Sequence, residues 1–283
     1  MSFSIQEALD YATKTLSSSR PRLEGEILLS FVLGVSRIYL HTHSKQVLSS
    51  SEYECFMQVL DRAREGEPIE YITQKVSFYD WEFEITQGVL IPRPETELLV
   101  QKCDELIKER GIERVFELGV GSGIISISLA LLNPKLQIIS SDINPLAISL
   151  TQKNIQKLSS LDTSLSERIT LFQGDILEDD EFFLTHHFGL WVSNPPYIAN
   201  DYVLPKNVSF EPKEALFGGE RGDEILQKII KKTKQHSIPY LACEMGWDQK
   251  EMMAQALSEF DEVEFYQDLS GLDRGFVAKI MKG

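Results

Sequence analysis

The stretch at 189–197 constrains the fold of this chain more than any other. Its apolar run at 190–192 is typical of a buried strand. The run stops at Pro195 and Pro196, because proline has no N–H to donate to a neighbouring strand. Asn194 and Tyr197 flank the prolines, so the sequence predicts an amide and an aromatic ring at the carboxyl end of a strand. Open α/β sheets bind their ligands at that end.

The chain after Gly111 alternates strand patterns with helix patterns. Strand patterns are found at 115–118, 136–142, 169–172, 190–192 and 239–243. Two more, at 263–265 and 276–280, are close enough in sequence to pair with each other antiparallel. Repeated strand–helix units predict an α/β fold with a mainly parallel sheet and helices on both faces.

The first 75 residues follow a helical period instead and predict a small helical domain. Gly34 is the predicted end of one helix, and Ser51 with Glu54 is the predicted capping box of another. The period changes to that of strands at 76–91, where Gln87-Gly88 is the predicted turn of a β-hairpin. We place the domain boundary in this hairpin.

Composition limits the partners of the protein. Forty-three acidic residues against 28 basic ones give a net charge of −15, which repels nucleic-acid phosphates, so we expect no direct nucleic-acid binding. The basic stretch at 228–234 has the spacing of a solvated helix face. Three scattered cysteines indicate buried thiols in a reducing compartment. We see neither a signal peptide nor an apolar run of about 20 residues, and expect a cytoplasmic monomer that binds no membrane.

A glycine-rich loop follows the first strand of the predicted sheet and consists of Gly119, Val120, Gly121, Ser122 and Gly123. Glycines at this place allow a ligand to approach the backbone at a helix N-terminus, although tight packing also explains them. Asp142 ends the next strand, where its carboxylate can accept hydrogen bonds from both ribose hydroxyls of a nucleoside. Alternatively, Asp142 caps the helix that Pro145 begins.

Glu117 lies directly before the loop, where a phosphate-binding protein avoids negative charge. A nucleoside without phosphates and with a cationic group fits it better. S-adenosylmethionine (SAM) meets both conditions and NAD does not, and the G-x-G-x-G spacing also disfavours a dinucleotide. Gly174-Asp175 ends the third strand, where it either meets the adenine or forms a turn. We expect no metal site, because the pairs His41/His43 and His186/His187 have no carboxylates or cysteines at ligand spacing.

The strand end at 194–197 can bind a planar NH₂ group. An amide nitrogen is a poor nucleophile because its lone pair is delocalised into the neighbouring π system. The side-chain carbonyl of Asn194 and the backbone carbonyl of Pro195 can each accept one N–H, which favours a tetrahedral nitrogen and stabilises its developing charge. Pro196 holds the backbone in place, and Tyr197 can pack on the flat face of the amide or base. Catalysis would be mostly positioning; alternatively, this is an ordinary strand terminator with Tyr197 in the core.

Four further stretches complete a pattern of motifs: residues 67–72, residues 89–97, Glu211-Pro212 with 215–219, and Asp268 with Asp273-Arg274. Together with 194–197 and the glycine loop, the pattern resembles the protein-(glutamine-N5) methyltransferases that modify peptide chain release factors, the bacterial PrmC/HemK family. The resemblance covers nearly the whole chain. Asn-Pro-Pro-Tyr alone would also fit adenine-N6 and cytosine-N4 DNA methyltransferases.

The resemblance implies three parts of the chain: a helical substrate-recognition domain at 1–75, a β-hairpin linker at 76–92, and a seven-stranded Rossmann-like, SAM-dependent methyltransferase domain at 93–283. Two positions depart from the family pattern. Gln74 stands where the family often has glycine, and Ile176 stands where some members have an aromatic residue against adenine.

The resemblance also implies the site. SAM would be bound by residues 119–123, Asp142 and Asn194. The acceptor, the Gly-Gly-Gln glutamine of class 1 release factors, would lie on Asn194, Pro195, Pro196 and Tyr197, and its methylation supports translation termination. Asn194, Pro195 and Tyr197 would be catalytic. Arg93 and Glu97 either line this cleft, or Glu95 and Glu97 are first-turn acids favoured by the helix dipole.

Three other functions stay open at this point. The acceptor could be a glutamine of a ribosomal protein, or an adenine or cytosine of a nucleic acid, although the acidic charge and the lack of a basic recognition domain count against the latter. A non-enzymic SAM-binding adaptor is the third, and Asn194 with Pro195 argues against it.

Overall fold

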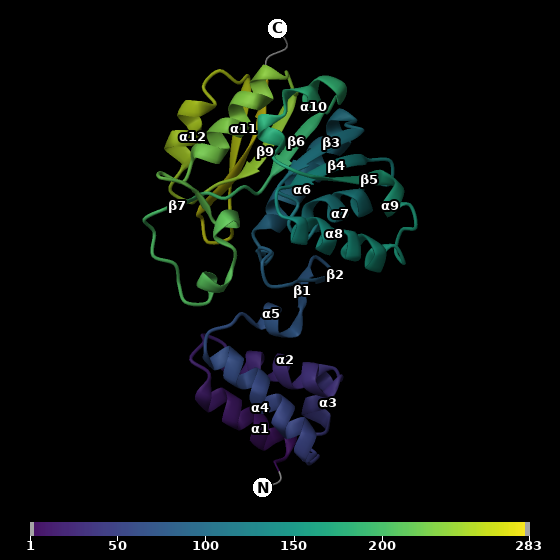
Figure 1. Ribbon diagram of the computed structural model, residues 1–283, viewed down its shortest axis with the longest axis vertical. Helices are drawn as coiled ribbons and strands as arrows, with labels where there is room; N and C mark the ends of the chain where they lie inside the picture. The colour runs from purple at the N-terminus through teal and green to yellow at the C-terminus, as the bar shows by residue number, and fades with distance from the viewer. Residues whose placement is uncertain (1–2, 281–283) are drawn as a thin grey trace. The chain divides into compact units, whose positions relative to one another are not determined.

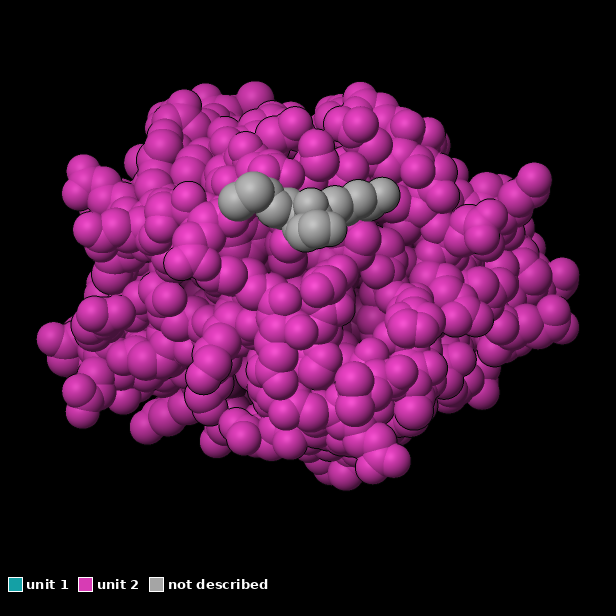
Figure 2. All heavy atoms as spheres, turned by 90° about the horizontal axis from the view of Figure 1, so that it is seen from above, with its two compact units in different colours: residues 1–75, 204–210 teal, residues 76–203, 211–283 magenta. Residues whose placement is uncertain are grey.

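The computed structural model describes residues 3–280 and divides into two compact units (Figure 1). The smaller unit consists of residues 1–75 and 204–210, and the larger unit of residues 76–203 and 211–283. Figure 2 shows the larger unit as a continuous surface of packed side chains. The segment at 204–210 belongs to the smaller unit although the chain on both sides of it belongs to the larger one. The division expected from the sequence did not include residues 204–210 in the helical domain.

A seven-stranded sheet forms the centre of the larger unit (Figure 1). Its strands in spatial order are β10 (Glu262–Gln267), β11 (Asp273–Lys279), β9 (Tyr240–Glu244), β6 (Leu190–Ser193), β3 (Arg114–Leu118), β4 (Gln137–Asp142) and β5 (Ile169–Gln173). The strands from β9 to β5 are parallel, whereas β11 and β10 pair antiparallel. The predicted α/β class, mainly parallel sheet and antiparallel pair are confirmed.

Helices cover both faces of this sheet (Figure 1). One face carries α6 (Thr96–Arg110), α7 (Ile124–Leu132), α8 (Pro145–Leu158) and α9 (Leu165–Arg168). The other carries the 3-10 turn η1 (Ile176–Glu178), α10 (Asp180–Thr185), α11 (Glu224–Gln235) and α12 (Lys250–Ala256). Successive side chains of a strand point to opposite faces, so Val115 enters the first apolar core and Phe116 the second. Packing in the two apolar cores therefore fixes the positions of the strands whose carboxyl ends carry the predicted motifs.

The order of the strands reverses between β3 and β6. The chain runs outward from β3 through β4 to β5 and then returns to place β6 on the other side of β3. Such a reversal is where open α/β sheets bind ligands. Leu118 of β3 pairs with Ser193 of β6, so Gly119 and Asn194 are the next residues on the two neighbouring strand ends.

The hairpin before the sheet lies earlier in the chain than predicted. β1 (Lys75–Phe78) pairs with β2 (Trp81–Glu84), so the hairpin turn is Tyr79-Asp80. Gln87-Gly88 forms a turn as predicted, closed by the Val89 N–H donating to the Thr86 carbonyl at 3.2 Å, but the prediction that it is the turn of the hairpin is wrong. Glu97 of α6 holds the hairpin turn. Its carboxylate accepts a hydrogen bond from the Tyr79 N–H at 2.7 Å, and its carbonyl accepts one from the Tyr79 hydroxyl at 3.0 Å. A local alternation pattern contains no trace of that contact.

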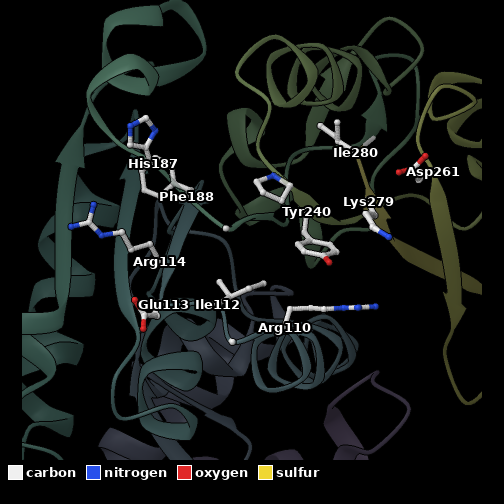
Figure 3. A pocket seen from close by; sticks show the side chains of 13 residues that line it. Arg110, Ile112, Glu113, Arg114, His187, Phe188, Tyr240, Asp261, Lys279 and Ile280 are labelled. Carbon is white, nitrogen blue, oxygen red and sulfur yellow. The ribbon is translucent and has the colours of Figure 1, made fainter. Parts of the chain in front are cut away.

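A hollow of about 760 Å³ opens at the amino ends of the parallel strands (Figure 3). Its walls include Arg114 at the start of β3, Gly189 before β6, Tyr240 at the start of β9 and Lys279 at the end of β11. The predicted motifs follow the carboxyl ends of the strands. The hollow therefore lies at the opposite edge of the sheet from the candidate site.

The smaller unit is a helical bundle of α1 (Ile5–Thr15), α2 (Pro21–Leu33), α3 (Arg37–Thr42), α4 (Ser50–Arg64) and α5 (Ile69–Thr73), with the 3-10 turn η2 (Val208–Phe210). Gly34 ends α2 in the left-handed conformation, as predicted. The capping box of α4 is Ser49 with Glu52, so the prediction of Ser51 and Glu54 is wrong by two residues. The sequence contains two overlapping Ser-x-x-Glu patterns there.

The three cysteines are free thiols with different surroundings. Cys103 and Cys243 are buried in the two cores of the larger unit, as expected. Cys55 is exposed on α4, so the expectation of a buried thiol is wrong for this residue. Within residues 3–280, no helix is long and apolar enough to cross a membrane.

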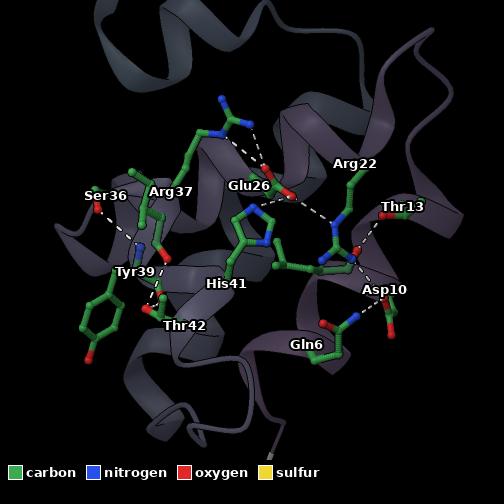
Figure 4. A network of polar contacts seen from close by, with 12 residues as sticks. Gln6, Asp10, Thr13, Arg22, Glu26, Ser36, Arg37, Tyr39, His41 and Thr42 are labelled. Carbon is green, nitrogen blue, oxygen red and sulfur yellow. Dashed lines mark hydrogen bonds and ion pairs between the residues drawn. The ribbon is translucent and has the colours of Figure 1, made fainter.

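The buried carboxylate of Glu26 joins α2 to α3 (Figure 4). It accepts hydrogen bonds from Arg22 at 3.2 Å and from Arg37 at 3.0 Å, and His41 Nε2 lies 3.4 Å away. Arg22 also reaches Asp10 of α1 at 2.9 Å. Burial raises the pKa of Glu26, but the bonds from Arg37 and Arg22 outweigh it and leave the pKa below its usual value.

We expect Glu26→Gln to destabilise the smaller unit by about 1 to 2 kcal/mol, because charge-assisted hydrogen bonds are lost. The folded-state pKa is lowered, so this contribution is present above the unfolded Glu pKa of about 4.3 and is lost as pH falls through the folded value. Hydrogen exchange of the α2 amides at pH 7 measures the loss of stability in the variant. The same measurement below pH 4 tests whether the difference from the wild type disappears on acidification. The control is Glu54→Gln, an exposed position on α4; equal protection of both variants at pH 7 would contradict the account.

Gln74, the departure from the family's glycine, ends α5 in the left-handed conformation with φ 58°. That conformation costs a residue with a Cβ about 1 kcal/mol, and glycine avoids the cost. We therefore expect Gln74→Gly to stabilise the protein by about 0.5 to 1 kcal/mol in denaturant unfolding. Gln58→Gly, at an exposed position inside α4, should have the opposite sign.

Candidate active site

The glycine loop leaves β3 and opens α7. Its first two N–H groups donate to the carbonyl of Ser141 in β4, at 2.8 and 3.0 Å. Gly121 has φ 56° and open space where a Cβ would stand. Gly123 has φ 84°, and a Cβ there would lie 2.7 Å from Thr151 of α8. Both explanations of the glycines thus hold: Gly123 is required by packing, and Gly121 leaves room beside the backbone.

The residues between the glycines, Val120 and Ser122, are buried. The carbonyl of Ser122 accepts a hydrogen bond from Asn154 of α8 at 2.8 Å, and the carbonyl of Gly121 accepts one from Thr151 at 3.0 Å. The loop is therefore held between β4 and α8. Contacts within the protein therefore determine the conformation of the loop.

Asp142 ends β4 beside this loop. Its Oδ2 accepts a hydrogen bond from the Gly121 N–H and its Oδ1 accepts one from the Asn144 N–H, both at 2.9 Å. Asn144, whose side chain accepts from the Leu146 N–H, is the N-cap of α8. The alternative that Asp142 caps this helix is therefore wrong. Burial raises the pKa of Asp142, and the two backbone bonds oppose that rise.

Glu117 is fully buried in β3, two residues before the loop. Its Oε2 accepts hydrogen bonds from the hydroxyls of Ser126 and Ser140. Its Oε1 is buried without a hydrogen-bond partner among the described residues. Burial holds the pKa of Glu117 well above its usual value. An orphaned acceptor of this kind fits a ligand that brings N–H groups or positive charge.

Asn194 follows the fully buried strand β6. Ser193 anchors the strand end, because its hydroxyl donates to the Leu118 carbonyl of β3 at 2.8 Å. The Asn194 Nδ2 donates to the Thr96 hydroxyl of α6 at 3.2 Å. One N–H of the amide is used in this bond, and Oδ1, on the other branch of the amide, can accept a hydrogen bond.

The backbone after Asn194 is clamped by the segment around Gly218. A Cβ on Gly218 would lie 2.4 Å from the Pro196 carbonyl, and one on Gly222 would lie 2.5 Å from the Tyr197 carbonyl. The short strands β7 (Ile198–Ala199) and β8 (Phe217–Gly219) pair in parallel here, which the sequence analysis did not predict. Gln249 donates to the Tyr197 carbonyl at 3.0 Å. Two distant segments, the one around Gly218 and the one at Gln249, thus fix the backbone of Pro196 and Tyr197.

The ring of Tyr197 is partly buried and packs against the core on the α11 face of the sheet. Burial, and next the nearby charge of Glu244, raise the pKa of its phenol to about 12. The phenol is therefore neutral at physiological pH. Pro195, two residues before Tyr197, is buried.

Arg93 and Glu97 have structural partners. Arg93 donates to Glu211 at 2.6 Å and to the Ile91 carbonyl at 3.0 Å, while the other carboxylate oxygen of Glu211 accepts from the Ile91 N–H at 3.0 Å. Glu97 lies in the first turn of α6 and holds the hairpin turn. Glu211, part of a motif far along the chain, thus fixes the segment that leads into α6.

Asp175 forms a turn, the second of its two proposed roles. Its side chain accepts from the Leu177 N–H at 3.1 Å and caps the 3-10 turn η1. Ile176 is 6 % exposed and belongs to the core beside α10 and α11. Among the described residues, no group of three or more His, Cys, Asp or Glu could hold a metal ion.

Sequence reasoning missed Glu244 and Thr96. Glu244 ends β9, beside β6, and is 4 % exposed with its Oε1 unpartnered among the described residues. Burial raises its pKa to about 7. The available signal was the position of Glu244 at a strand end, the same signal that singled out Asp142 and Asn194.

Comparisons with known proteins agree on one kind of relative. The PrmC N-terminal domain family matches residues 7–73, and the methyltransferase small domain family matches residues 94–209. A release factor glutamine methyltransferase of Koribacter versatilis is 31% identical, over 97% of this chain and 98% of its own. One of Dictyoglomus turgidum is 35% identical over 84% and 83%. One of Aquifex aeolicus is 32% identical over 92% of each chain.

Solved structures share the fold at low identity. The hMettl16 catalytic domain in complex with MAT2A 3'UTR hairpin 6 has a TM-score of 0.57 and 14% identity, over 84% of this chain and 86% of its own. The delta-N METTL16 MTase domain has a TM-score of 0.53 and 16% identity, over 71% and 89%. These likenesses concern the fold alone.

We expect Gly218→Ala to destabilise the larger unit by about 2 to 3 kcal/mol, because the added methyl group overlaps the Pro196 and Gly222 carbonyls. All three tryptophans lie in the larger unit, so denaturant unfolding followed by tryptophan fluorescence reports it. The control is Gly271→Ala, where φ is 77° but the space is open, and about 1 kcal/mol is expected. Equal losses of stability in the two variants would show that the structure relieves the close contact at Gly218 without a free-energy cost.

Proposed function

The chain belongs to the family of release factor glutamine methyltransferases, and we propose that its site methylates the side-chain nitrogen (N5) of the Gly-Gly-Gln glutamine in class 1 release factors. It is a SAM-dependent methyltransferase. The observation that carries the site assignment is the bond from Asn194 Nδ2 to Thr96, which leaves the carbonyl branch of the amide as an acceptor.

SAM, when bound, supplies an electrophilic methyl group. We assign its binding to residues 119–123, Asp142 and Asn194. Three features support this assignment: the open space at Gly121, the carboxylate of Asp142 at the end of β4, and the orphaned Oε1 of Glu117. The carboxylate suits the ribose hydroxyls, and the orphaned oxygen suits the positive charge of the methionine part.

Two acceptors at the end of β6 suit the glutamine amide. The Asn194 Oδ1 and the Pro195 carbonyl would each accept one N–H of the substrate NH₂ group, which turns the nitrogen lone pair away from the carbonyl carbon. The same acceptors stabilise the positive charge that develops on the nitrogen. Because Pro196 and Tyr197 are clamped by Gly218 and Gly222, these acceptors need little reorganisation during the reaction. Tyr197 would pack against the flat amide.

The rest of the chain is assigned around this chemistry. Residues 1–75, most of which match the PrmC N-terminal domain family, would recognise the release factor, with the hairpin at 76–92 as linker and 93–283 as the catalytic part. We further propose a monomer that acts in the cytoplasm, where translation terminates. The net charge of −15 supports a protein acceptor over a nucleic acid.

The deciding assay supplies labelled SAM with a purified class 1 release factor, a ribosomal protein or DNA, followed by mass spectrometry. We expect label on the release factor, located at the Gly-Gly-Gln glutamine, and none on a release factor in which alanine replaces that glutamine. Label on the ribosomal protein or on DNA, with none on the release factor, would establish one of the alternative acceptors.

We expect Asn194→Ala to lower kcat at least 100-fold, because an acceptor aimed at the developing charge is removed. SAM binding, measured by calorimetry, should weaken but persist. The control is Asn133→Ala, a partly buried amide that donates to Asp104 at 2.8 Å and follows α7, at the other edge of the sheet. Full activity of Asn194→Ala would contradict the amide-acceptor account.

A further inference from the structure

We propose that Trp247, Leu269 and Leu272 form an apolar docking surface for the release factor, beside the site that receives its acceptor glutamine. This inference deepens the proposed function and rests on it, because it gives the larger unit a share in holding the acceptor protein. All three side chains are exposed: Leu269 completely, Trp247 to 60 % and Leu272 to 39 %. None of them belongs to an apolar core of the larger unit.

The loop that carries Trp247 is bonded to the candidate active site. Residues 245–249 join β9 to α12. Within this loop the Gly246 N–H donates to Gln249 Oε1 at 2.8 Å, and Gln249 Nε2 donates to the Tyr197 carbonyl at 3.0 Å. Gln249 is buried, whereas Trp247, two residues earlier, is exposed. The loop therefore holds an exposed tryptophan close to the segment that begins at Asn194.

The turn between β10 and β11, which carries the two leucines, is organised by Asp268. Its Oδ1 accepts hydrogen bonds from the N–H groups of Ser270 and Leu272, at 2.8 and 3.0 Å, and its Oδ2 accepts one from Arg274 Nε at 2.8 Å. The Asp268 N–H donates to the Leu272 carbonyl at 2.9 Å. Polar contacts thus fix the conformation in which Leu269 and Leu272 are exposed.

Two contacts join the loop to the strand that follows this turn, one on each side of Trp247. The Met245 N–H donates to the Arg274 carbonyl at 2.9 Å, and the Lys250 ammonium donates to the Asp273 carboxylate, also at 2.9 Å. The last motif of the sequence, to which Asp273 and Arg274 belong, thus holds the turn beside the loop. The three apolar side chains are therefore carried by one connected frame.

The docking surface lies at the edge of the sheet that carries the candidate site. β9 and β10 both run in the direction of β6, so the residues that follow them lie at the same edge as Asn194. β10 is the third strand from β6, about 14 Å away at the usual spacing. A specific interface covers about 800 Å² of each partner, a patch about 30 Å across. A protein whose glutamine lies at Asn194 therefore extends to the docking surface.

The exposed side chains suit an apolar partner. Single exposed apolar residues are common on protein surfaces, but these three share a frame that is bonded to the backbone of Tyr197. Tryptophan is enriched among the residues that dominate binding at protein interfaces, because it buries a large area at little cost in conformational freedom. Methyl transfer to an amide does not itself require these side chains. They fit an apolar patch of the release factor next to its Gly-Gly-Gln glutamine.

The first experiment measures the Kd of a class 1 release factor without SAM, so that no methyl transfer is needed. We expect Trp247→Ala and the double variant Leu269→Ser/Leu272→Ser each to raise this Kd about 10-fold, because apolar contacts are lost. The matched control is Leu161→Ser/Leu184→Ser, two exposed leucines that precede β5 and β6 and so lie near the opposite edge of the sheet. Unchanged affinity in both docking-surface variants would overturn the proposal.

The second experiment separates docking from chemistry. With SAM saturating, Leu269→Ser/Leu272→Ser should raise the KM for release factor about 10-fold, while kcat and the Kd for SAM change less than about twofold. This split is expected because the leucines contact the acceptor protein and not its reacting amide. A fall in kcat without a change in KM would contradict a docking role.

A third measurement observes the surface directly. Trp191 is fully buried and Trp81 partly buried, whereas Trp247 is exposed. Binding of the release factor should shift the Trp247 emission to shorter wavelength and protect it from quenching by acrylamide. Both changes should be lost in Trp247→Phe, which keeps an apolar ring and should bind with an affinity close to that of the wild type. The same shift in Trp247→Phe would count against contact at this residue.

The outcomes distinguish the docking surface from the proposed function. If the variants weaken binding of the release factor but the wild type methylates no glutamine in it, the proposed function fails and the docking surface stands. If the release factor is methylated and its Kd is equal in the wild type and the variants, only the docking surface fails. A dimer that sedimentation detects in the wild type and not in Leu269→Ser/Leu272→Ser, with unchanged affinity for release factor, would assign the surface to a second copy of the chain and overturn the proposal.

Discussion

The pairing of β3 with β6 is the contact on which the rest of the site depends. Leu118 faces Ser193 across the two strands, and the Ser193 hydroxyl donates to the Leu118 carbonyl at 2.8 Å. This pairing ends two neighbouring strands at one level, with the glycine loop after one and Asn194 after the other. A shift by one residue would exchange the two faces of β6, so Trp191 and Val192 would each enter the wrong core. Packing in the two apolar cores therefore fixes the register between β3 and β6, and with it the relative positions of the glycine loop and Asn194.

Segments far apart in the sequence hold these strand ends in place. Glu211 fixes the segment that leads into α6, and α6 brings Thr96 to Asn194. Gly218 is needed because two backbone carbonyls leave no room for a Cβ beside Pro196. The motifs at 89–97, at Glu211 and at 215–219 thus position the backbone and the amide at the end of β6, which suits a reaction that depends on placement more than on a strong base.

The elements with strong local patterns were predictable, and those held by distant contacts were not. The strands around Asp142 and Asn194 follow apolar runs with clear stops, so their ends are visible in the sequence. The hairpin turn at Tyr79 is set by Glu97, 18 residues later, and no local pattern reports it. Of two overlapping Ser-x-x-Glu patterns, the one at Ser49 forms the capping box, a choice that the spacing alone does not make. The partnership of Thr96 with Asn194 spans 98 residues.

Two buried carboxyls give the site its electrostatic character. Glu117 in β3 and Glu244 in β9 each keep one oxygen without a partner among the described residues, and burial raises the pKa of both. An unsatisfied buried acceptor costs a folded protein about 1 to 3 kcal/mol, so stability alone does not favour either. Under the proposed function, the positive charge of a methyl donor bound beside the glycine loop would offset this cost at Glu117.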